Sequence, residues 1–396
     1  MAETLFKIRT LNNIAVAGLR RLPRKHYEVA SEIANPDAYI VRSFDMHALE
    51  IPATVLAVAR AGAGTNNIPV AELGKRGIPV FNAPGANANA VKELVLAGMF
   101  MSARNLERAA RYVRTLEASD AELDAAVEKG KKQFVGFELP GRTLGVVGLG
   151  AIGVEVANAA LSLGMKVVGY DPSITVQRAW QLSAGVNKAA NLDELFSRSD
   201  VVTLHVPLVE ETRGLVSRER LRVMRRGSVV LNFARGGIVD EQAVVEALDE
   251  GQLGAYVNDF PSNALRRRDD VISLPHLGAS TNEAEENSAI MAAENLKAFL
   301  EDGNVRYSVN FPETALERKR PHRLAIPHRN IPNMVAQILT SLAEENINIA
   351  DLLNRSREEL SYTIVDIDSP ASGATLEKIR GINGILSVRV LPIIEG

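Results

Sequence analysis

Three glycines and one aspartate between residues 143 and 171 form the sequence pattern with the most specific chemistry. Gly148, Gly150 and Gly153 follow a short apolar run, and Asp171 ends a second apolar run after a helical stretch. In such a strand–helix–strand unit the first glycine permits a tight turn, the second lets backbone approach a pyrophosphate, and the third packs helix on strand. Unpaired N–H groups at the helix start attract the anion. The pattern predicts a dinucleotide site.

Asp171 indicates which dinucleotide binds. A carboxylate at the end of the second strand can hydrogen-bond both hydroxyls of an adenosine ribose. No basic residue occurs at positions 172–174, so a 2′-phosphate would meet repulsion and find no partner. We therefore expect NAD rather than NADP as the cofactor.

Arg235 and His276 are the candidates for catalysis in the same domain. Arg235 lies between a small residue and paired glycines, where its guanidinium can reach a carboxylate or carbonyl without obstruction. His276 follows a later strand, and an imidazole can hold or release a proton near neutral pH. From position alone, either residue is as readily structural as functional. Neither shows metal-ligand spacing, so no metal site is predicted.

Two more arginines, Arg42 and Arg60, stand at the ends of predicted strands in the first hundred residues. Ligands of open α/β sheets gather at the carboxyl ends of strands, which makes both arginines candidates for an anionic substrate. The alternative is that both are ordinary solvated surface residues.

The elements that must position these residues divide the chain into three parts. Short apolar runs predict buried parallel strands in a first domain at 38–42, 55–59 and 79–82, and in the cofactor domain at 144–147, 166–170, 200–205, 227–232, 255–258 and 271–274. Helices are expected at 91–106, 240–249 and 282–300. Beyond a charged, proline-bounded linker at 311–321, the order β, α, β, β, α, β predicts a ferredoxin-like module.

The expected fold class is therefore α/β, with two doubly wound parallel-sheet domains and a terminal ferredoxin-like module. The predicted limits are 1–97 with 284–312 for the substrate-binding domain, 98–283 for the Rossmann NAD-binding domain, and 322–396 for the terminal module.

Composition narrows the class of protein further. The 396 residues carry 45 basic and 48 acidic side chains, a net charge of −3, so no general attraction to nucleic acid or membrane is expected. The absence of cysteine excludes disulfides, thiolate metal sites and a cysteine nucleophile. No apolar run approaches the roughly 18 residues of a membrane span, and the N-terminus has no apolar signal core, so a cytoplasmic location is expected.

Five motifs make the chain similar to the D-2-hydroxyacid dehydrogenases. In order they are VVGLGAIG, YDP, LHVPL, NFARGGIVD and PHLGAST. The segments VRS and RAGAGTNN, with the terminal module, resemble the phosphoglycerate dehydrogenase branch of that family, in which an ACT regulatory domain follows and which serves serine biosynthesis. The resemblance covers essentially the whole chain. It implies that 3-phospho-D-glycerate is oxidised to 3-phosphohydroxypyruvate.

The resemblance also implies roles for individual residues. Arg235 would anchor the substrate carboxylate and polarise the C2 oxygen, while His276 would take the hydroxyl proton. The implied NAD contacts, beyond the glycines and Asp171, are Ala151, Ile152, Val206, Pro207, Ala234, Asp259 and Gly278. Arg42, Arg60 and Gly62 would bind the phosphorylated substrate. Relatives form dimers or tetramers, so a homodimer or homotetramer is expected.

One position departs from the family pattern. Relatives place a glutamate a few residues after the AYVND strand, where it orients the histidine and supplies charge; the nearest match here is Asn263. An amide accepts a hydrogen bond but carries no negative charge. We therefore expect 2-oxo-acid reduction to fall off at a lower pH than in enzymes with the glutamate, unless Asp259, Asp269 or Asp270 supplies that charge.

The terminal module contains residues that match an effector site in serine-sensitive relatives. The resemblance implies that His328, Asn330 and Asn348 bind L-serine between two ACT domains. Asn333 stands where relatives usually have glycine. The alternative is a dimerisation module without a ligand.

Two rival functions stay open. One is reduction of glyoxylate or hydroxypyruvate by the same chemistry, although the two arginines favour a phosphorylated substrate. The other is a non-catalytic, NAD-binding regulatory protein on the same fold, which the missing glutamate favours and the presence of Arg235 and His276 opposes.

Overall fold

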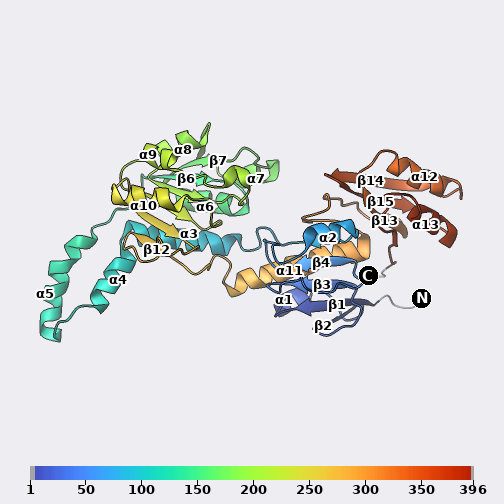
Figure 1. Cartoon of the computed structure of the whole chain (residues 1–396), viewed down its shortest axis with the longest axis horizontal. Coiled ribbons are helices and arrows are strands. Elements are labelled where there is room, and N and C mark those ends of the chain that lie inside the picture. The colour runs from blue at the N-terminus through green and yellow to red at the C-terminus, as the bar shows by residue number, and fades with distance from the viewer. Residues whose placement is uncertain (1–4, 394–396) are drawn as a thin grey trace. The chain divides into compact units, whose positions relative to one another are not determined.

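The computed structural model describes residues 5–393, so the predicted domain limits at 1 and 396 lie outside the described residues. The chain divides into two compact units (Figure 1). Among the described residues, one unit comprises those up to 86 and those from 282 onward, and the other comprises residues 87–281. The first domain and the terminal module therefore belong to one unit, and the predicted cofactor domain forms most of the other.

The first domain is built on a parallel five-stranded sheet in the order β2-β1-β3-β4-β5. The strands are β1 (Phe6–Leu11), β2 (Tyr27–Ala30), β3 (Ala38–Val41), β4 (Ala57–Arg60) and β5 (Val80–Phe81). Its helices are α1 (Val16–Leu19), α2 (Val70–Lys75) and the long α11 (Asn282–Asp302). Apolar residues of α11 pack with β1, β3 and β4, so this late segment completes the core of the first domain.

The second unit has a parallel seven-stranded sheet in the order β12-β11-β10-β9-β6-β7-β8. The strands are β6 (Thr143–Val147), β7 (Lys166–Tyr170), β8 (Val186–Lys188), β9 (Val201–Leu204), β10 (Ser228–Asn232), β11 (Leu253–Asn258) and β12 (Val271–Ser273). This is a doubly wound sheet whose direction of winding reverses between β6 and β9. The predicted strands of this domain are all confirmed.

Helices cover both faces of this sheet. One face packs with α3 (Ala88–Ala103) and α6 (Ala151–Ser162), and the opposite face packs with α8 (Leu192–Arg198), α9 (Arg218–Val223) and α10 (Glu241–Asp249). Two helices, α4 (Leu106–Arg114) and α5 (Asp120–Gly130), extend away from the sheet (Figure 1). The remaining short helices are α7 (Val176–Gln181), η1 (Lys131–Phe134) and η2 (Glu210–Thr212). None of the helices found among the described residues is long and apolar enough to cross a membrane.

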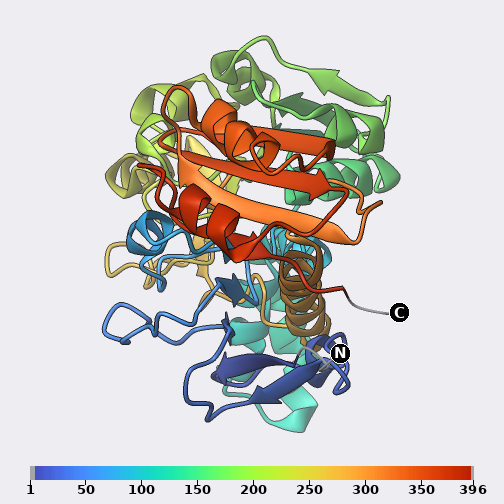
Figure 2. The ribbon, with the colours of Figure 1, turned by 90° about the vertical axis from the view of Figure 1, so that its right-hand side faces the viewer.

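The terminal module has the predicted β, α, β, β, α, β order and an antiparallel four-stranded sheet, β14-β15-β13-β16. Its elements are β13 (His322–Arg329), α12 (Met334–Ala343), β14 (Ile349–Arg357), β15 (Leu360–Ile367), α13 (Gly373–Arg380) and β16 (Arg389–Val390). Both helices lie on one face of the sheet (Figure 2), over apolar residues that include Leu324, Ile326 and Val365.

The opposite face of this sheet continues the core of the first domain. Tyr362 and Ile364 from β15 are fully buried in the same cluster as Phe299 and Phe311. The Tyr362 ring lies 6.4 Å from Phe299 and 6.1 Å from Phe311, between ring centroids. The guanidinium of Arg389 lies 4.4 Å from the centre of the Phe299 ring. The module is therefore joined to the first domain by a buried apolar interface.

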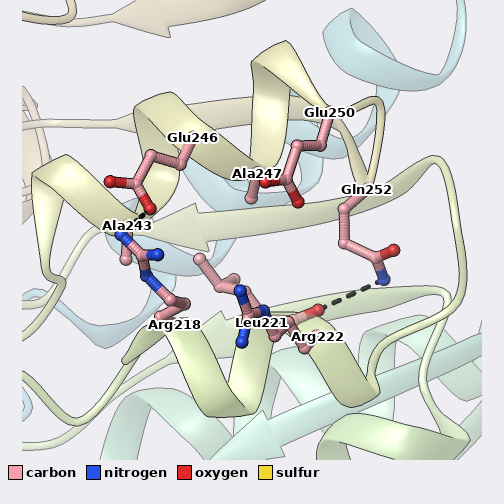
Figure 3. Close-up of a pocket in the computed structure, with 8 residues that line it drawn as sticks. All are labelled: Arg218, Leu221, Arg222, Ala243, Glu246, Ala247, Glu250 and Gln252. Atoms are coloured by element: carbon pink, nitrogen blue, oxygen red, sulfur yellow. Dashed lines mark hydrogen bonds and ion pairs between the residues drawn. The ribbon is translucent and has the colours of Figure 1, made fainter.

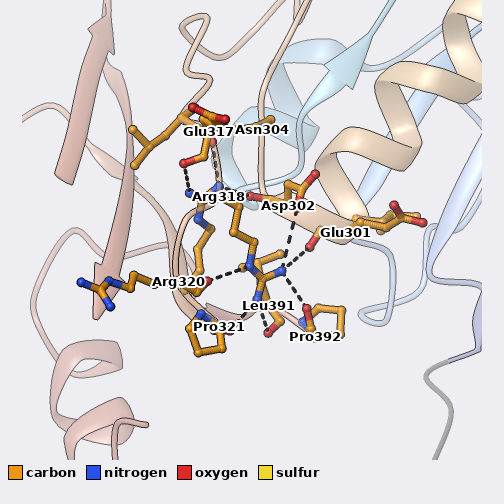
Figure 4. A network of polar contacts seen from close by, with 12 residues as sticks. Glu301, Asp302, Asn304, Glu317, Arg318, Arg320, Pro321, Leu391 and Pro392 are labelled. Atoms are coloured by element: carbon orange, nitrogen blue, oxygen red, sulfur yellow. Dashed lines mark hydrogen bonds and ion pairs between the residues drawn. The ribbon is translucent and has the colours of Figure 1, made fainter. Parts of the chain in front are cut away.

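Three arginines complete this junction at the carboxyl end of α11. Arg389 donates to the carbonyls of Phe299 and Leu300, Arg318 to that of Glu301, and Arg323 to that of Asp302. Figure 4 shows Arg318 among these groups, with further bonds to the carbonyls of Pro321, Leu391 and Pro392. The last carbonyls of a helix lack intrahelical partners and carry partial negative charge, so cationic donors stabilise them.

Candidate active site

The glycine turn has the geometry that a pyrophosphate requires. Gly148 has a φ of 89°, and a Cβ there would lie 2.6 Å from the His205 carbonyl oxygen. A Cβ on Gly153 would lie 1.9 Å from the Gly148 carbonyl oxygen, so helix and turn touch. A Cβ on Gly150 would meet no atom within 4 Å. The space over Gly150, at the start of α6, is where backbone can approach a ligand.

Asp171 stabilises this turn directly. Its Oδ2 accepts a hydrogen bond of 2.8 Å from the N–H of Leu149, between the first two glycines, and its Oδ1 accepts one from Ser173. Each carboxylate oxygen keeps a further lone pair for a ribose hydroxyl. The first helical residues are the predicted contacts Ala151 and Ile152, while Val206 and Pro207 follow β9 across the switch point. These residues fit NAD at the carboxyl edge of the sheet.

Arg235 lies in the loop after β10. Asn232 holds this loop from both sides, because its Oδ1 accepts from Ala234 N and its Nδ2 donates to the Arg235 carbonyl. The exposed guanidinium of Arg235 donates to the Ala234 carbonyl at 2.7 Å. A Cβ on Gly236 would lie 3.7 Å from Phe260, so this loop reaches the segment after β11.

His276 is exposed and has left-handed backbone, with a φ of 58°, which is unfavourable for a residue other than glycine. Asp259 compensates for this strain. Its two carboxylate oxygens accept hydrogen bonds of 2.8 Å from the N–H groups of Leu277 and Gly278, and Asp259 itself is only 1% exposed. The Phe260 ring lies 5.0 Å from the imidazole, between ring centroids. The His276 turn is thus held by a buried carboxylate and an aromatic ring.

Asn263 and the two aspartates expected to supply the missing charge, Asp269 and Asp270, each have another partner. Asn263 accepts from Arg266, Asp269 pairs with Arg111, and Asp270 pairs with Arg268. Between residues 5 and 393, no carboxylate hydrogen-bonds or ion-pairs with the His276 imidazole. The carboxylate of Asp259 accepts hydrogen bonds from the backbone N–H groups of the two residues after His276 and not from its ring.

His205 is a partly buried polar residue that the sequence did not single out. Its Nε2 hydrogen-bonds with the Thr203 hydroxyl at 3.0 Å, and its buried Nδ1 has no partner among the described residues. Burial lowers the pKa of His205 to about 3, so the ring is neutral at neutral pH. It follows β9 beside the glycine turn, and only the LHVPL motif could have drawn attention to it.

The predicted substrate arginines lie in the first domain, at the carboxyl ends of two paired strands. Arg42 follows β3, and Arg60 ends β4. The Arg60 Nε donates to the Arg42 carbonyl and to Asn67 Oδ1, both at 3.1 Å. A Cβ on Gly62 would lie 2.5 Å from Arg60 Nη1, so the glycine makes room for that guanidinium. The structure therefore brings Arg42, Arg60 and Gly62 together.

The predicted effector residues have different environments. His328 is 2% exposed; its Nδ1 donates to the Arg329 carbonyl at 2.8 Å, and its Nε2 hydrogen-bonds with the Thr363 hydroxyl. Asn330 and Asn348 are exposed. Asn333 has a φ of 68°, and asparagine tolerates this left-handed conformation best after glycine. Asparagine therefore fits the backbone at this position.

A shallow pocket between α9 and α10 is not the cofactor site. It is lined by side chains that include Leu221, Ala247 and Gln252, and Arg218 pairs with Glu246 across it (Figure 3). Gln252 directly precedes β11, so the pocket extends toward the amino ends of the strands, whereas ligands bind at the carboxyl ends. No cluster of potential metal ligands occurs among the described residues.

The order of the strands defines a doubly wound sheet, and the glycine turn with Asp171 defines a dinucleotide-binding protein. The comparison with known proteins supports this class. The family model described as "D-isomer specific 2-hydroxyacid dehydrogenase, NAD binding domain" matches residues 96–278. The cofactor of this domain is NAD.

Alignments with individual relatives cover more of the chain than this family model does. The D-3-phosphoglycerate dehydrogenase of Haemophilus influenzae is 34% identical over 358 residues, 87% of this chain and 83% of that protein. The enzyme of the same name from Methanocaldococcus jannaschii is 35% identical over 82% of this chain, which spans 61% of that relative's length. The NAD⁺-bound 3-phosphoglycerate dehydrogenase of Entamoeba histolytica superposes with a TM-score of 0.59 at 27% identity, covering 77% of this chain and 99% of that one. The chain belongs to the D-3-phosphoglycerate dehydrogenase family.

Proposed function

We propose that the chain catalyses the NAD-dependent oxidation of 3-phospho-D-glycerate to 3-phosphohydroxypyruvate, the first step of L-serine biosynthesis. The observation that carries this proposal is the grouping of Arg235 and His276 on neighbouring loops at the carboxyl edge of the NAD-binding sheet, linked through Phe260. A protein that only binds NAD needs no more than the glycine turn. An anion-binding guanidinium and a proton-accepting imidazole at the same edge are what oxidation of a 2-hydroxy acid requires.

Each side chain has a definite task in this proposal. Arg235 leaves the Ala234 carbonyl to bind the substrate carboxylate and polarise the C2 oxygen. His276 accepts the proton of the C2 hydroxyl on a ring nitrogen, in the orientation that Asp259 and Phe260 impose. NAD, when bound, supplies the acceptor for the C2 hydride. Ala234, which precedes Arg235, and Gly278, two residues after His276, are proposed contacts of the cofactor.

The substrate's phosphate is assigned to the first domain. Arg42 and Arg60 follow neighbouring strands, and two guanidinium groups suit a phosphate better than a hydroxyl. These arginines favour phosphoglycerate over the unphosphorylated acids of the glyoxylate and hydroxypyruvate reductases.

Steady-state assays test the proposal and its rivals. We expect NAD reduction with 3-phosphoglycerate, with kcat reduced about 10²- to 10⁴-fold by His276→Ala and kcat/KM reduced by Arg235→Ala. Lys132→Ala, at an exposed position in η1, is a control that should keep activity. Faster turnover of glyoxylate or hydroxypyruvate would favour the reductase, and NAD binding without turnover of any of these acids would favour the regulatory protein.

We also propose that the terminal module is an ACT domain that binds L-serine through Asn330, Asn348 and His328. Its βαββαβ topology supports this assignment. Because both ring nitrogens of His328 are already bonded, serine has to displace the Thr363 hydroxyl or bind beside it. Isothermal titration with L-serine tests the assignment: absence of heat and of inhibition at millimolar serine would leave a module without an effector.

A homodimer or homotetramer is part of the proposal as well. The extended helix α4 exposes Leu106 and Val113, and α4 and α5, which the structure describes in full, contain no buried residue. Exposed apolar side chains on an extended arm are typical of an interface with a second copy. Light scattering on the purified chain measures the assembly.

A further inference from the structure

The side chain of Arg42 has a partner that the sequence did not indicate. Its Nη2 lies 2.5 Å from Oε1 of Glu285, and both side chains are 38% exposed. Glu285 belongs to the first turn of α11, about 240 residues farther along the chain. The arginine proposed to bind the phosphate is therefore neutralised by a carboxylate.

This ion pair lies where the first sheet should bind its ligand. The order β2-β1-β3-β4-β5 reverses between β1 and β3, and open α/β sheets bind ligands outside the carboxyl ends of the strands at such a switch point. Asn12, after β1, accepts hydrogen bonds from the N–H groups of Ser43 and Phe44, which joins the two loops. The Arg42 carbonyl accepts from Arg60 and Asn67. The backbone of Arg42 is thus fixed, and Glu285 orients its side chain.

We propose that Glu285 is a specificity-determining residue of the substrate site. Its carboxylate pairs with the Arg42 guanidinium until the phosphate of the substrate binds there in its place. This inference rests on the proposed function. A phosphate carries about −1.5 to −2 charges at neutral pH and three acceptor oxygens, so it competes with a single carboxylate for the guanidinium. A hydroxyl carries no charge and leaves the pair intact. A partly exposed ion pair is weak enough to be exchanged in this way.

Glu285→Gln tests the proposal because the amide keeps the size and a hydrogen-bond acceptor but removes the charge. The KM for 3-phosphoglycerate should fall roughly two- to fivefold, the range expected for a partly exposed pair. The KM for D-glycerate, which has no phosphate, should not change. Glu286→Gln is the matched control, since Glu286 is the next residue of α11, carries the same charge and is exposed.

A double-mutant cycle separates this role from a structural one. In an Arg42→Met background, Glu285→Gln should lower the KM for 3-phosphoglycerate by a smaller factor than it does alone, because the ion pair that it relieves has been removed. An unchanged or higher KM for Glu285→Gln alone, or an equal fall for Glu286→Gln, overturns the inference while the proposed function stands. If the unmodified chain does not turn over 3-phosphoglycerate, the proposed function fails and this inference fails with it.

Discussion

Asp259 shows how a single buried carboxylate shapes the candidate active site. The resemblance implies that this residue contacts NAD. In the structure, both of its carboxylate oxygens accept hydrogen bonds from backbone N–H groups that follow His276. Hydrogen bonds to a charged group stabilise by about 1.5–3 kcal/mol each, which exceeds the roughly 1–2 kcal/mol that a left-handed residue costs. Asp259 is therefore able to hold His276 in its strained conformation.

Asp259→Asn should impair catalysis through His276. The amide can accept only one of the two N–H groups, and its NH₂ opposes the other, so the turn relaxes and the imidazole moves. A displacement of about 1 Å can reduce kcat about 100-fold, and we expect a loss of 10- to 100-fold. In a His276→Ala background the same substitution should have little further effect. Equal losses in both backgrounds would mean that Asp259 acts independently of the histidine.

Residue roles that follow from local sterics could be predicted from the sequence, and those that depend on distant partners could not. The separate positions of Gly148, Gly150 and Gly153 follow from a strand–helix turn and match the structure. The pairing of Arg42 with Glu285 joins residues about 240 positions apart, and no local pattern indicates it. The same holds for Asp259, whose partners lie 18 and 19 residues away.

At the scale of elements, buried parallel strands were predictable and half-exposed ones were not. The strands β6, β9 and β10 are buried at every position, and their continuous apolar runs are apparent in the sequence. The segment FKIRTL of β1 has polar residues between apolar ones, because only three of its six residues are buried. The strands β1 and β2 were therefore not predicted from the sequence, although they complete the first sheet.

The carboxyl end of α11 depends on charges supplied by the terminal module and its linker. Arg323, which is fully buried, forms a bidentate pair with Asp366 at 2.6 and 2.8 Å and donates to the carbonyls of Asp302, Leu316 and Glu317. Removing one partner of a buried pair leaves the other charge unpaired, which costs about 3–5 kcal/mol. This junction is therefore sensitive to single substitutions.

Arg323→Met should lower the free energy of unfolding by about 3–5 kcal/mol. Urea unfolding followed by circular dichroism measures the change. Arg320→Met is the control, because the exposed Arg320 side chain extends away from the network in Figure 4 and should change stability by no more than about 0.5 kcal/mol. Similar midpoints for the two variants would contradict a structural role for the buried pair.

At the scale of the whole molecule, the terminal module is part of the first domain's unit rather than a separate body. Phe299, Phe311 and Tyr362 are almost wholly buried where the module meets the first domain. Burying a side chain of this size stabilises by roughly 1.5–3 kcal/mol, and several such groups link the two parts. The polar contacts of Arg318, Arg323 and Arg389 add to this coupling.

The module and the first domain should consequently unfold together. In hydrogen exchange with increasing urea, peptides from β15 and from β4 should lose protection at the same concentration, because opening either one exposes the shared aromatic cluster. NAD at 100 times its Kd should protect peptides of β6 and β9 by about 2.7 kcal/mol, since it binds the other unit. Loss of protection in β15 well before β4 would show that the terminal module opens alone, and that the buried junction does not couple it to the first domain.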